Sequence, residues 1–286
     1  DVSLSNAYFG LTAIPNTVVN IGKQGLTTPY TVATDINGNE QTGTGILALT
    51  TVGPVTGGLG YFNNTNLNKS SELNATLGLG LENQITGAAG ATGTIDGGSD
   101  VYVATVQGDL DFVKLEAWYT GLQETFNTYT LAATGNVELA QDAKIALEAR
   151  YVNLKTKSNG DLALTGDDRK NDMFRLAADG KFSIVNARLA YTQTGKHGGL
   201  TAVDQDAKNT SLGWALSSNN VDKAKYWQAA LGADILDNLN FTVNYGNLKA
   251  DDRQTLVKTA QLTKNGDKLK QEEVYGQLTY KMSKNL

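Results

Sequence analysis

The chain alternates apolar and polar residues over short stretches, and residues 143–154 show this pattern most clearly. One set of alternate positions is apolar and ends on a tyrosine, namely Ile145, Leu147, Ala149 and Tyr151. The other set is Lys144, Ala146, Glu148 and Arg150, and three of these four residues are charged. Successive side chains of a strand point to opposite faces, so the pattern predicts a β-strand with one apolar and one polar face. A helix is the competing interpretation, but it would place the Glu148 carboxylate among apolar residues.

The same alternation recurs along the chain, and its apolar face repeatedly ends on a tyrosine where the strand runs into a long connection. These tyrosines are Tyr61, Tyr119, Tyr151, Tyr191 and Tyr245. A soluble sheet has no physical reason to place tyrosines at one height, whereas in a membrane barrel their amphipathic rings belong at the headgroup interface. The pattern therefore predicts an all-β chain that folds as a transmembrane antiparallel β-barrel.

Short turns and long polar connections alternate between the predicted strands, as they do in outer-membrane barrels. We place short turns at residues 108–109 and 137–142, and another directly after a strand that ends at residue 178. Residues 73–81 also alternate, but a crossing there would move every later short turn to the opposite side of the membrane. The glycine-rich stretch 63–99 is therefore predicted to be one long loop that folds into the lumen.

These strands give about thirteen crossings, whereas bacterial single-chain barrels close with an even number of strands. The odd number and the absence of a closing strand after residue 285 lead to one expectation. We expect residues 1–286 to form a single β-barrel domain that is incomplete at both ends.

Composition narrows the classes of function. The 24 basic and 29 acidic residues give a net charge of −5, which argues against a nucleic-acid partner. There is no cysteine, and no apolar run is long enough for a spanning helix. The single histidine, His197, opens a glycine-rich loop, where we expect a solvated side chain rather than a catalytic group. An enzyme is therefore not expected.

Charged side chains fall on the polar faces of the predicted strands, where they would line a water-filled pore. The predicted pore-lining residues are Lys114, Glu116, Lys144, Glu148, Arg150, Arg175 and Arg188. Most of this set is basic, so the acidic excess of the chain must lie elsewhere, mainly in loops. The predicted constriction loop within 63–99 carries Glu72, Glu82 and Asp96 against Lys69. Acidic groups at the narrowest point, with Glu40 nearby, predict a modest preference for cations.

Several segments, in their order and spacing, resemble the Campylobacter-type major outer membrane protein porins. They are Tyr8-Phe9-Gly10-Leu11-Thr12, Ile21-Gly22-Lys23-Gln24, Gly43-Thr44-Gly45-Ile46, Leu115-Glu116-Ala117-Trp118-Tyr119 and the strand at 145–151. The resemblance implies a barrel of about 18 strands, usually a homotrimer, in the outer membrane of a Gram-negative bacterium. It also implies contact with outer-membrane lipids and lipopolysaccharide, and passage of small hydrophilic solutes.

The same resemblance implies a place for calcium, because carboxylates near the constriction of that family can hold this ion. Glu40, just before Gly43-Thr44-Gly45, is the best placed carboxylate here, and Asp35 is the next. Calcium takes six or more oxygen ligands, which the sequence alone does not assemble. No other cofactor is expected.

Three functions compete for such a barrel. The first is a passive diffusion porin for ions and small hydrophilic solutes. The alternative is a structural or adhesive outer-membrane barrel that acts through its external loops, and the third is a barrel enzyme. A closed structural barrel would fill its lumen with apolar or tightly paired side chains. The predicted inner faces are instead rich in threonine, asparagine, glycine and single charges, which favours the porin.

Overall fold

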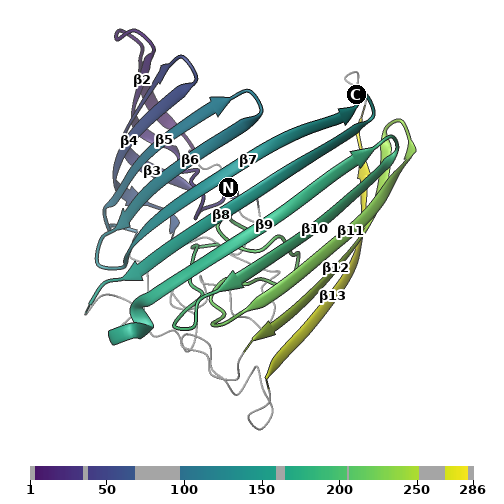
Figure 1. Ribbon diagram of the computed structural model, residues 1–286. Helices are drawn as coiled ribbons and strands as arrows, with labels where there is room; N and C mark the ends of the chain where they lie inside the picture. Colours follow the sequence, from purple (N-terminus) through teal and green to yellow (C-terminus); the bar gives the residue numbers. More distant parts are fainter. Residues whose placement is uncertain are drawn as a thin grey trace.

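The computed structural model describes residues 4–34, 38–67, 97–158, 165–204, 206–250 and 268–282. In this part of the chain, thirteen strands form one antiparallel sheet in which each strand pairs with its neighbours in sequence. The sheet curls into a barrel wall that carries loops on its concave side (Figure 1). No pairing among the described residues joins the first strand, β1 (Ala7–Leu11), to the last, β13 (Leu269–Tyr280). The predicted all-β antiparallel barrel fold is confirmed, and the described residues contain thirteen strands, the number predicted from the sequence.

The strands between these two follow the chain without crossovers. The first six are β2 (Thr17–Gly25), β3 (Thr42–Val52), β4 (Val55–Thr65), β5 (Val101–Leu110), β6 (Val113–Leu122) and β7 (Phe126–Ala140). The next five are β8 (Ala143–Thr156), β9 (Lys170–Phe182), β10 (Val185–Thr194), β11 (Lys225–Leu236) and β12 (Leu239–Ala250). One short 3₁₀ turn, η3 (Gly166–Arg169), precedes β9. No helix in the described ranges combines the length and apolar character that crossing a bilayer requires.

The predicted turn at 108–109 was wrong. β5 continues through both residues, and the chain turns instead at Asp111, whose φ of 57° is left-handed. Gly108 and Asp109 are residue types that favour turns. Here, however, Asp109 lies opposite Lys114 in the regular β5–β6 register, so the cross-strand pairing prevails over the local preference.

Two further turns were predicted too long. β7 runs to Ala140 and β9 runs to Phe182, so most of 137–142 and the residues directly after 178 belong to strands. Two acidic residues within the predicted turns are paired across the sheet, Glu138 with Lys144 and Asp179 with Arg188.

Short turns lie at one end of the barrel and the longer connections at the other, as predicted (Figure 1). The exception is the link between β6 and β7, where only residues 123–125 join the strands at the end of the long connections. Residues 68–96, which include the alternating stretch 73–81, lie outside the described residues. The lumen position predicted for the 63–99 loop therefore stays a prediction.

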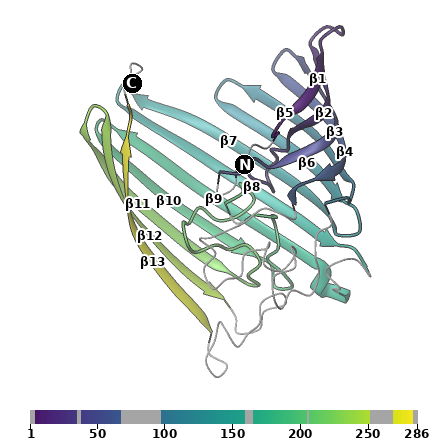
Figure 2. The same cartoon turned by 180° about the vertical axis from the view of Figure 1, so that it is seen from behind.

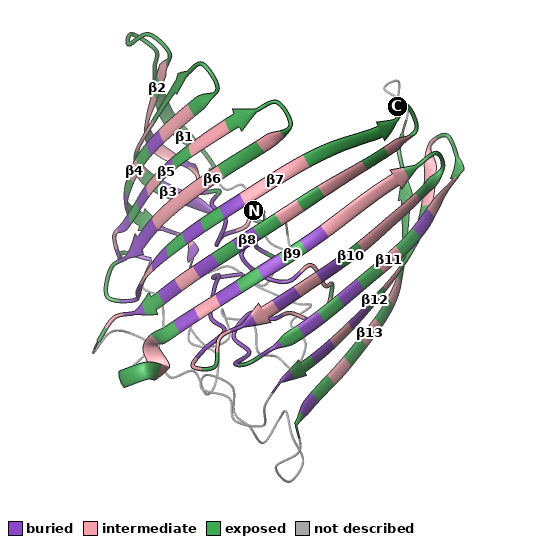
Figure 3. Cartoon of the chain, viewed as in Figure 1, coloured by how far each residue is buried: buried purple, intermediate pink, exposed green. Residues whose placement is uncertain are grey.

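Exposed and less exposed residues alternate along much of the sheet, as the apolar–polar alternation predicted (Figure 3). On β8, Leu147 and Tyr151 are 48% and 46% exposed on the outer face, whereas Arg150 between them is 4% exposed on the inner face. The registers from β6 to β10 continue these two faces, because each pairs outward residues with outward residues. The outer face presents the apolar surface that a bilayer requires.

The outward tyrosines form a row across neighbouring strands. Tyr119 lies directly opposite Tyr129, with ring centroids 5.1 Å apart. Tyr191 lies opposite Trp227, with centroids 4.5 Å apart. Tyr151 faces Phe174 in the same way on β8 and β9. The predicted girdle is thus an aromatic row at one height, near the end of the barrel that carries the long connections.

The apolar core lies inside the barrel at that same end. Tyr30 from the β2–β3 connection packs edge-on against Phe126 of β7, with ring centroids 6.0 Å apart. Leu154 of β8 and Leu200 from the β10–β11 connection are fully buried in the same cluster. Burying such a side chain stabilises the fold by about 1.5–3 kcal/mol. The connections are therefore packed against the inner wall at this end.

The exposure of β8 predicts how substitutions should behave in a membrane. Leu147 lies four residues from Tyr151 on the outer face, or about 13 Å along the strand, which places it deep in the apolar band. Leu147→Arg should lower the free energy of unfolding by about 2–4 kcal/mol, while Ala146→Arg, on the inner face, should cost little. Urea unfolding in lipid vesicles measures both values, and equal losses would contradict the assignment of faces.

Candidate functional site

The connection between β10 and β11 folds into the barrel and is called here the inner segment (residues 195–224, described except residue 205). From behind, it lies within the curl of the sheet (Figure 2). Most of its described residues are buried, among them Leu200, Thr201, Asn209 and Thr210, each of which has no exposed surface. This position was not predicted from the sequence, which indicated only a glycine-rich loop that begins near His197.

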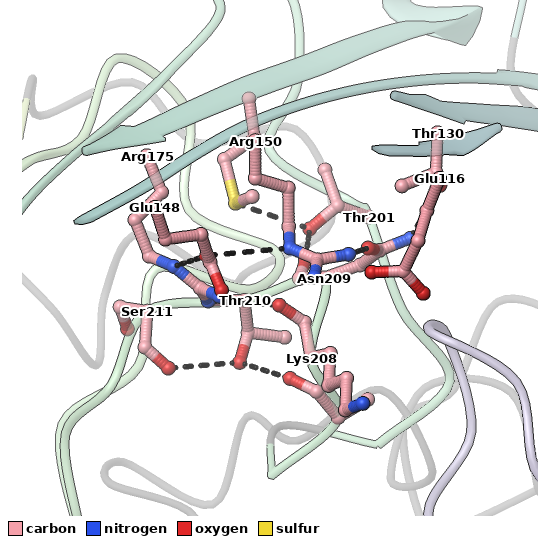
Figure 4. Close-up of polar contacts among 12 residues, drawn as sticks. Glu116, Thr130, Glu148, Arg150, Arg175, Thr201, Lys208, Asn209, Thr210 and Ser211 are labelled. Atoms are coloured by element: carbon pink, nitrogen blue, oxygen red, sulfur yellow. Dashed lines mark hydrogen bonds and ion pairs between the residues drawn. The ribbon is translucent and has the colours of Figure 1, made fainter. Parts of the chain in front are cut away.

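Two arginines on the inner wall contact this segment, and one glutamate lies between them (Figure 4). Arg150 of β8 and Arg175 of β9 are direct cross-strand partners, an arrangement in which like charges repel. Glu148 lies on the same face and resolves the conflict, because its Oε1 is 3.0 Å from Arg175 Nε and 3.5 Å from Arg150 Nε. The cluster is therefore two buried cations that share one carboxylate.

The remaining donors of both arginines reach the inner segment. Arg175 Nη1 donates to the backbone carbonyl of Lys208 at 2.8 Å and also to that of Thr210. Arg150 Nη1 donates to Asn209 Oδ1 at 3.1 Å. Arg175 is only 2% exposed. Both arginines lie on the inner wall as predicted, but the inner segment covers them, so their first role is to hold the segment.

Asn209 joins three parts of the molecule. Its side-chain amide donates to Thr130 Oγ1 on β7 at 2.8 Å, and its backbone N–H donates to the Pro29 carbonyl at 2.8 Å. Its own carbonyl accepts from Thr201 Oγ1 at 2.5 Å. Every polar group of this buried residue has a partner, which a water-excluded position requires.

A sequence signal for this docking was present but not used. At the ends of their strands, Val152 and Leu154 of β8 and Met173 of β9 fall on the inner face, and all are fully buried or nearly so. Apolar residues at three neighbouring lumen positions would be exposed to water unless another part of the chain covered them. They identify the end of the barrel that must receive a folded connection, although not which connection.

Lys144 and Arg188, two further predicted pore-lining residues, lie on the inner face away from the inner segment. Lys144 Nζ is 3.4 Å from Glu138 Oε1, and Arg188 Nε is 2.6 Å from Asp179 Oδ1. These four groups, with Lys181, line a polar cavity of about 620 Å³ towards the short-turn end.

Two predicted pore-lining residues sit on β6. Glu116 is half-buried and accepts from Trp118 Nε1 at 3.4 Å, while Lys114 is exposed opposite Thr134. For all seven residues the pore-lining role itself stays a prediction.

The inner wall is more acidic than the sequence analysis proposed. The inward carboxylates that it did not assign to the pore are Asp109, Glu138, Asp179, Asp234 and Glu273, and the added inward cation is Lys181. Asp109, Glu138 and Asp179 were not assigned to the pore because turns were predicted at their positions. Positive and negative groups are therefore nearly balanced on the described wall. The prediction that this wall is predominantly basic was wrong.

The carboxylates proposed for the constriction and for calcium are only partly described. Glu40 Oε2 accepts from Asn6 Nδ2 at 2.7 Å. Asp35, Glu72, Glu82 and Asp96 lie outside the described residues. Among the residues that are described, no three His, Asp or Glu side chains gather into a group that could hold a metal ion. Calcium stays a prediction.

His197 lies near the first residue of the inner segment, and its Nε2 is 3.9 Å from Asp167 Oδ2. A hydrogen bond from Lys170, and the charges of Lys170 and His197, lower the pKa of the Asp167 carboxyl. This exposed carboxylate therefore stays ionised at neutral pH beside the imidazole.

No protein-family model matches the chain, and no curated protein does either. Solved structures do match. OpdK of Pseudomonas aeruginosa, solved with vanillate, superposes with a TM-score of 0.70 at 13% identity, over 93% of this chain and 66% of that one. OccAB3 of Acinetobacter baumannii gives 0.68 at 12% identity, over 93% of this chain and 64% of that one. OccK5 (OpdH) of Pseudomonas aeruginosa gives 0.70 at 11% identity, over 95% and 69%.

The fold is therefore that of outer-membrane porin barrels. The structures that share it are porins rather than enzymes. The chain spans about two thirds of the length of the first of them. At these identities the likeness concerns the fold alone, and the Campylobacter-type family is not among the matches above.

The contacts of Arg175 predict what its loss should do. Arg175→Met keeps the side-chain length but removes the ion pair with Glu148 and the hydrogen bonds to the inner segment. Breaking a buried pair from one side costs about 3–5 kcal/mol, so the segment should leave the wall more often. Trypsin cleavage after the exposed Lys208, followed by mass spectrometry in detergent, should become at least about tenfold faster.

Arg188→Met is the matched control, because Arg188 lies on the same inner face but pairs with Asp179. It should leave cleavage at Lys208 unchanged. Equal rates in the two variants would show that Arg175 does not hold the segment.

The inner segment also contains a carboxyl group that should titrate near physiological pH. Although its side chain is exposed, the surrounding protein disfavours the charged form of Asp206, and the neighbouring Asp204 adds repulsion; together they raise the pKa of Asp206 to about 6. Its negative charge should be present at pH 7.5 and lost as the pH falls through this value. A carboxyl NMR titration checks this, and Asp204→Asn should lower the midpoint. A midpoint near 4 in both proteins would contradict it.

Proposed function

We propose that the protein is a passive diffusion channel in the outer membrane of a Gram-negative bacterium. The observation that carries the proposal is the division of one curled sheet into two surfaces. The outer face is apolar and bears an aromatic row, while the inner face bears paired charges and amides around a cavity of about 620 Å³. Such a wall suits lipid outside and water inside.

The solutes that fit this wall are ions and small hydrophilic molecules. The side chains around the cavity include both signs of charge and several amides, so they can replace the hydration of polar solutes without favouring one functional group. The inner segment narrows the passage near the opposite end, where its exposed groups include Asp206 and Lys208.

A modest preference for cations is the finer part of the proposal. The described wall is nearly balanced, so the acidic excess of the whole chain, at −5, should decide the sign. The carboxylates proposed to act at the constriction are Glu72, Glu82, Asp96 and Glu40. Charges outside the lumen are screened over about 8 Å at physiological salt, so only carboxylates close to the passage would contribute.

The partners follow from the same reasoning. Outer-membrane lipids and lipopolysaccharide would cover the apolar outer face, and a homotrimer in the manner of the Campylobacter-type porins is the proposed assembly. Membership of that family is itself a proposal, supported by the order and spacing of the segments quoted above. The binding of calcium by Glu40 and Asp35 is also a proposal, and it is supported by the same resemblance.

The second candidate is a structural or adhesive barrel that acts through its external loops. One observation favours it, because a buried apolar cluster with Tyr30, Phe62 and Phe126 fills part of the interior at the end of the long connections. The polar cavity at the other end favours the channel. Electrical recording separates the two, because a sealed barrel does not conduct.

The full-length protein, reconstituted in planar bilayers, should produce stepwise ionic currents without ATP. In a KCl gradient the reversal potential should indicate a modest excess of K⁺ over Cl⁻. Glu72→Gln, Glu82→Gln and Glu40→Gln should each shift it towards zero, since each removes a negative charge proposed to lie near the passage.

Folded protein that gives no current steps would favour the adhesive barrel. An anion-selective wild type, or a cation preference untouched by all three changes, would show that these carboxylates do not set the selectivity.

A further inference from the structure

A second attachment holds the inner segment on the β13 side of the barrel. The backbone N–H groups of Trp214, Ala215 and Leu216 donate to the Glu273 carboxylate at 3.0, 2.8 and 3.1 Å. The Tyr226 hydroxyl donates to the same carboxylate at 2.8 Å. Hydrogen bonds to an ionised acceptor are stronger than neutral ones. One side chain of β13 thus receives four of them, three from the inner segment.

The local sequence is adapted to this close approach. A Cβ atom added at Gly213 would lie 2.7 Å from Glu273 Oε1, and closer still to the backbone carbonyl of Leu216 and to the Tyr226 hydroxyl. A larger residue there would have to displace the backbone of the inner segment at Leu216 as well as the carboxylate, and so would disturb the hydrogen bonds between the three amides and Glu273. Only glycine lets the backbone lie so close to the group that it binds.

The indole ring of Trp214 adds a contact on the same side, with its centroid 5.5 Å from that of Tyr275 on β13. The inner segment is therefore held on both sides of the barrel interior, by Thr130, Arg150 and Arg175 on β7 to β9 and by Glu273 on β13. A segment attached on one side alone could swing across the passage, whereas two attachments keep it still.

We propose that Glu273 is a positioning residue that keeps the inner segment against the wall and so keeps the pore steadily open. The proposal rests on the channel function proposed above and goes beyond it by assigning the steadiness of the current to one carboxylate. Glu273 acts through the segment and need not contact the passing solute. Releasing the three amides should therefore produce intermittent closures while the ion preference stays the same.

Single-channel recording of the full-length protein tests this with two variants that keep every charge. Glu273→Asp shortens the side chain so that it no longer reaches all three amides, and Gly213→Ala places a methyl group against the Leu216 carbonyl, the Tyr226 hydroxyl and the carboxylate. Because several charge-assisted hydrogen bonds are lost, closures should become on the order of tenfold more frequent in both variants. The reversal potential should not move, because the charge of the lumen is unchanged.

Glu272→Gln is the matched control. Glu272 is the preceding residue of β13 but lies on the outer face, where it accepts from Asn247 at 2.9 Å. This variant removes a carboxylate from the same strand without touching the inner segment, so its current should be as steady as that of the wild type. Tyr226→Phe removes one of the four donors and should give an intermediate closure rate.

The outcomes distinguish this proposal from the one on which it rests. If the wild type conducts and both Glu273→Asp and Gly213→Ala are equally steady, the positioning role is overturned while the channel function stands. If folded wild-type protein gives no current steps, the channel function fails and this proposal falls with it. Should one of the two variants not fold, the other and Tyr226→Phe still decide, because a wild-type closure rate in both overturns the role.

Discussion

The requirement that every backbone polar group in a bilayer be hydrogen-bonded within the protein dominates this structure. Hydrocarbon offers no water to an unpaired N–H or C=O, so strands must pair with neighbours along their whole membrane-spanning length. That pairing sets the register, and the register determines which side chains meet. It places Tyr151 beside Phe174 outside the wall and, one residue earlier on β8, Arg150 beside Arg175 inside it. The same backbone hydrogen bonds between β8 and β9 therefore determine both the lipid-facing aromatic contacts and the inner charge cluster.

Much of the fold could be predicted because its main signal is local. A period of two is visible within a few residues, so the strands, the outward tyrosines and the inward charges of β8 follow from the sequence. The turn positions could not be predicted equally well. Asp109 and Asp179 favour turns by themselves, but each lies opposite a cation on the next strand, and that partner is known only once the register is known.

The shape of the inner segment could not be predicted from the sequence, because apolar and polar residues do not alternate along it with a regular period. Its shape depends on individual contacts, such as those between Asn209 and Thr130 or between Arg175 and the backbone of Thr210, and none of these follows from composition. The sequence could show that Val152, Leu154 and Met173 needed a cover. It could not show which connection supplies that cover, because several connections are long enough to reach.

The attachments of the inner segment also constrain the order in which the molecule can fold. Its hydrogen bonds join residues far apart in the chain, from Asn209 back to Thr130 across 79 positions and from Ala215 forward to Glu273 across 58. Closing contacts over such distances costs chain entropy, which is repaid only after both partners are held in place. The segment can therefore dock only when the wall from β7 to β13 exists. Until that last step the nascent barrel has a wider bore than the finished one, and narrowing the bore completes assembly.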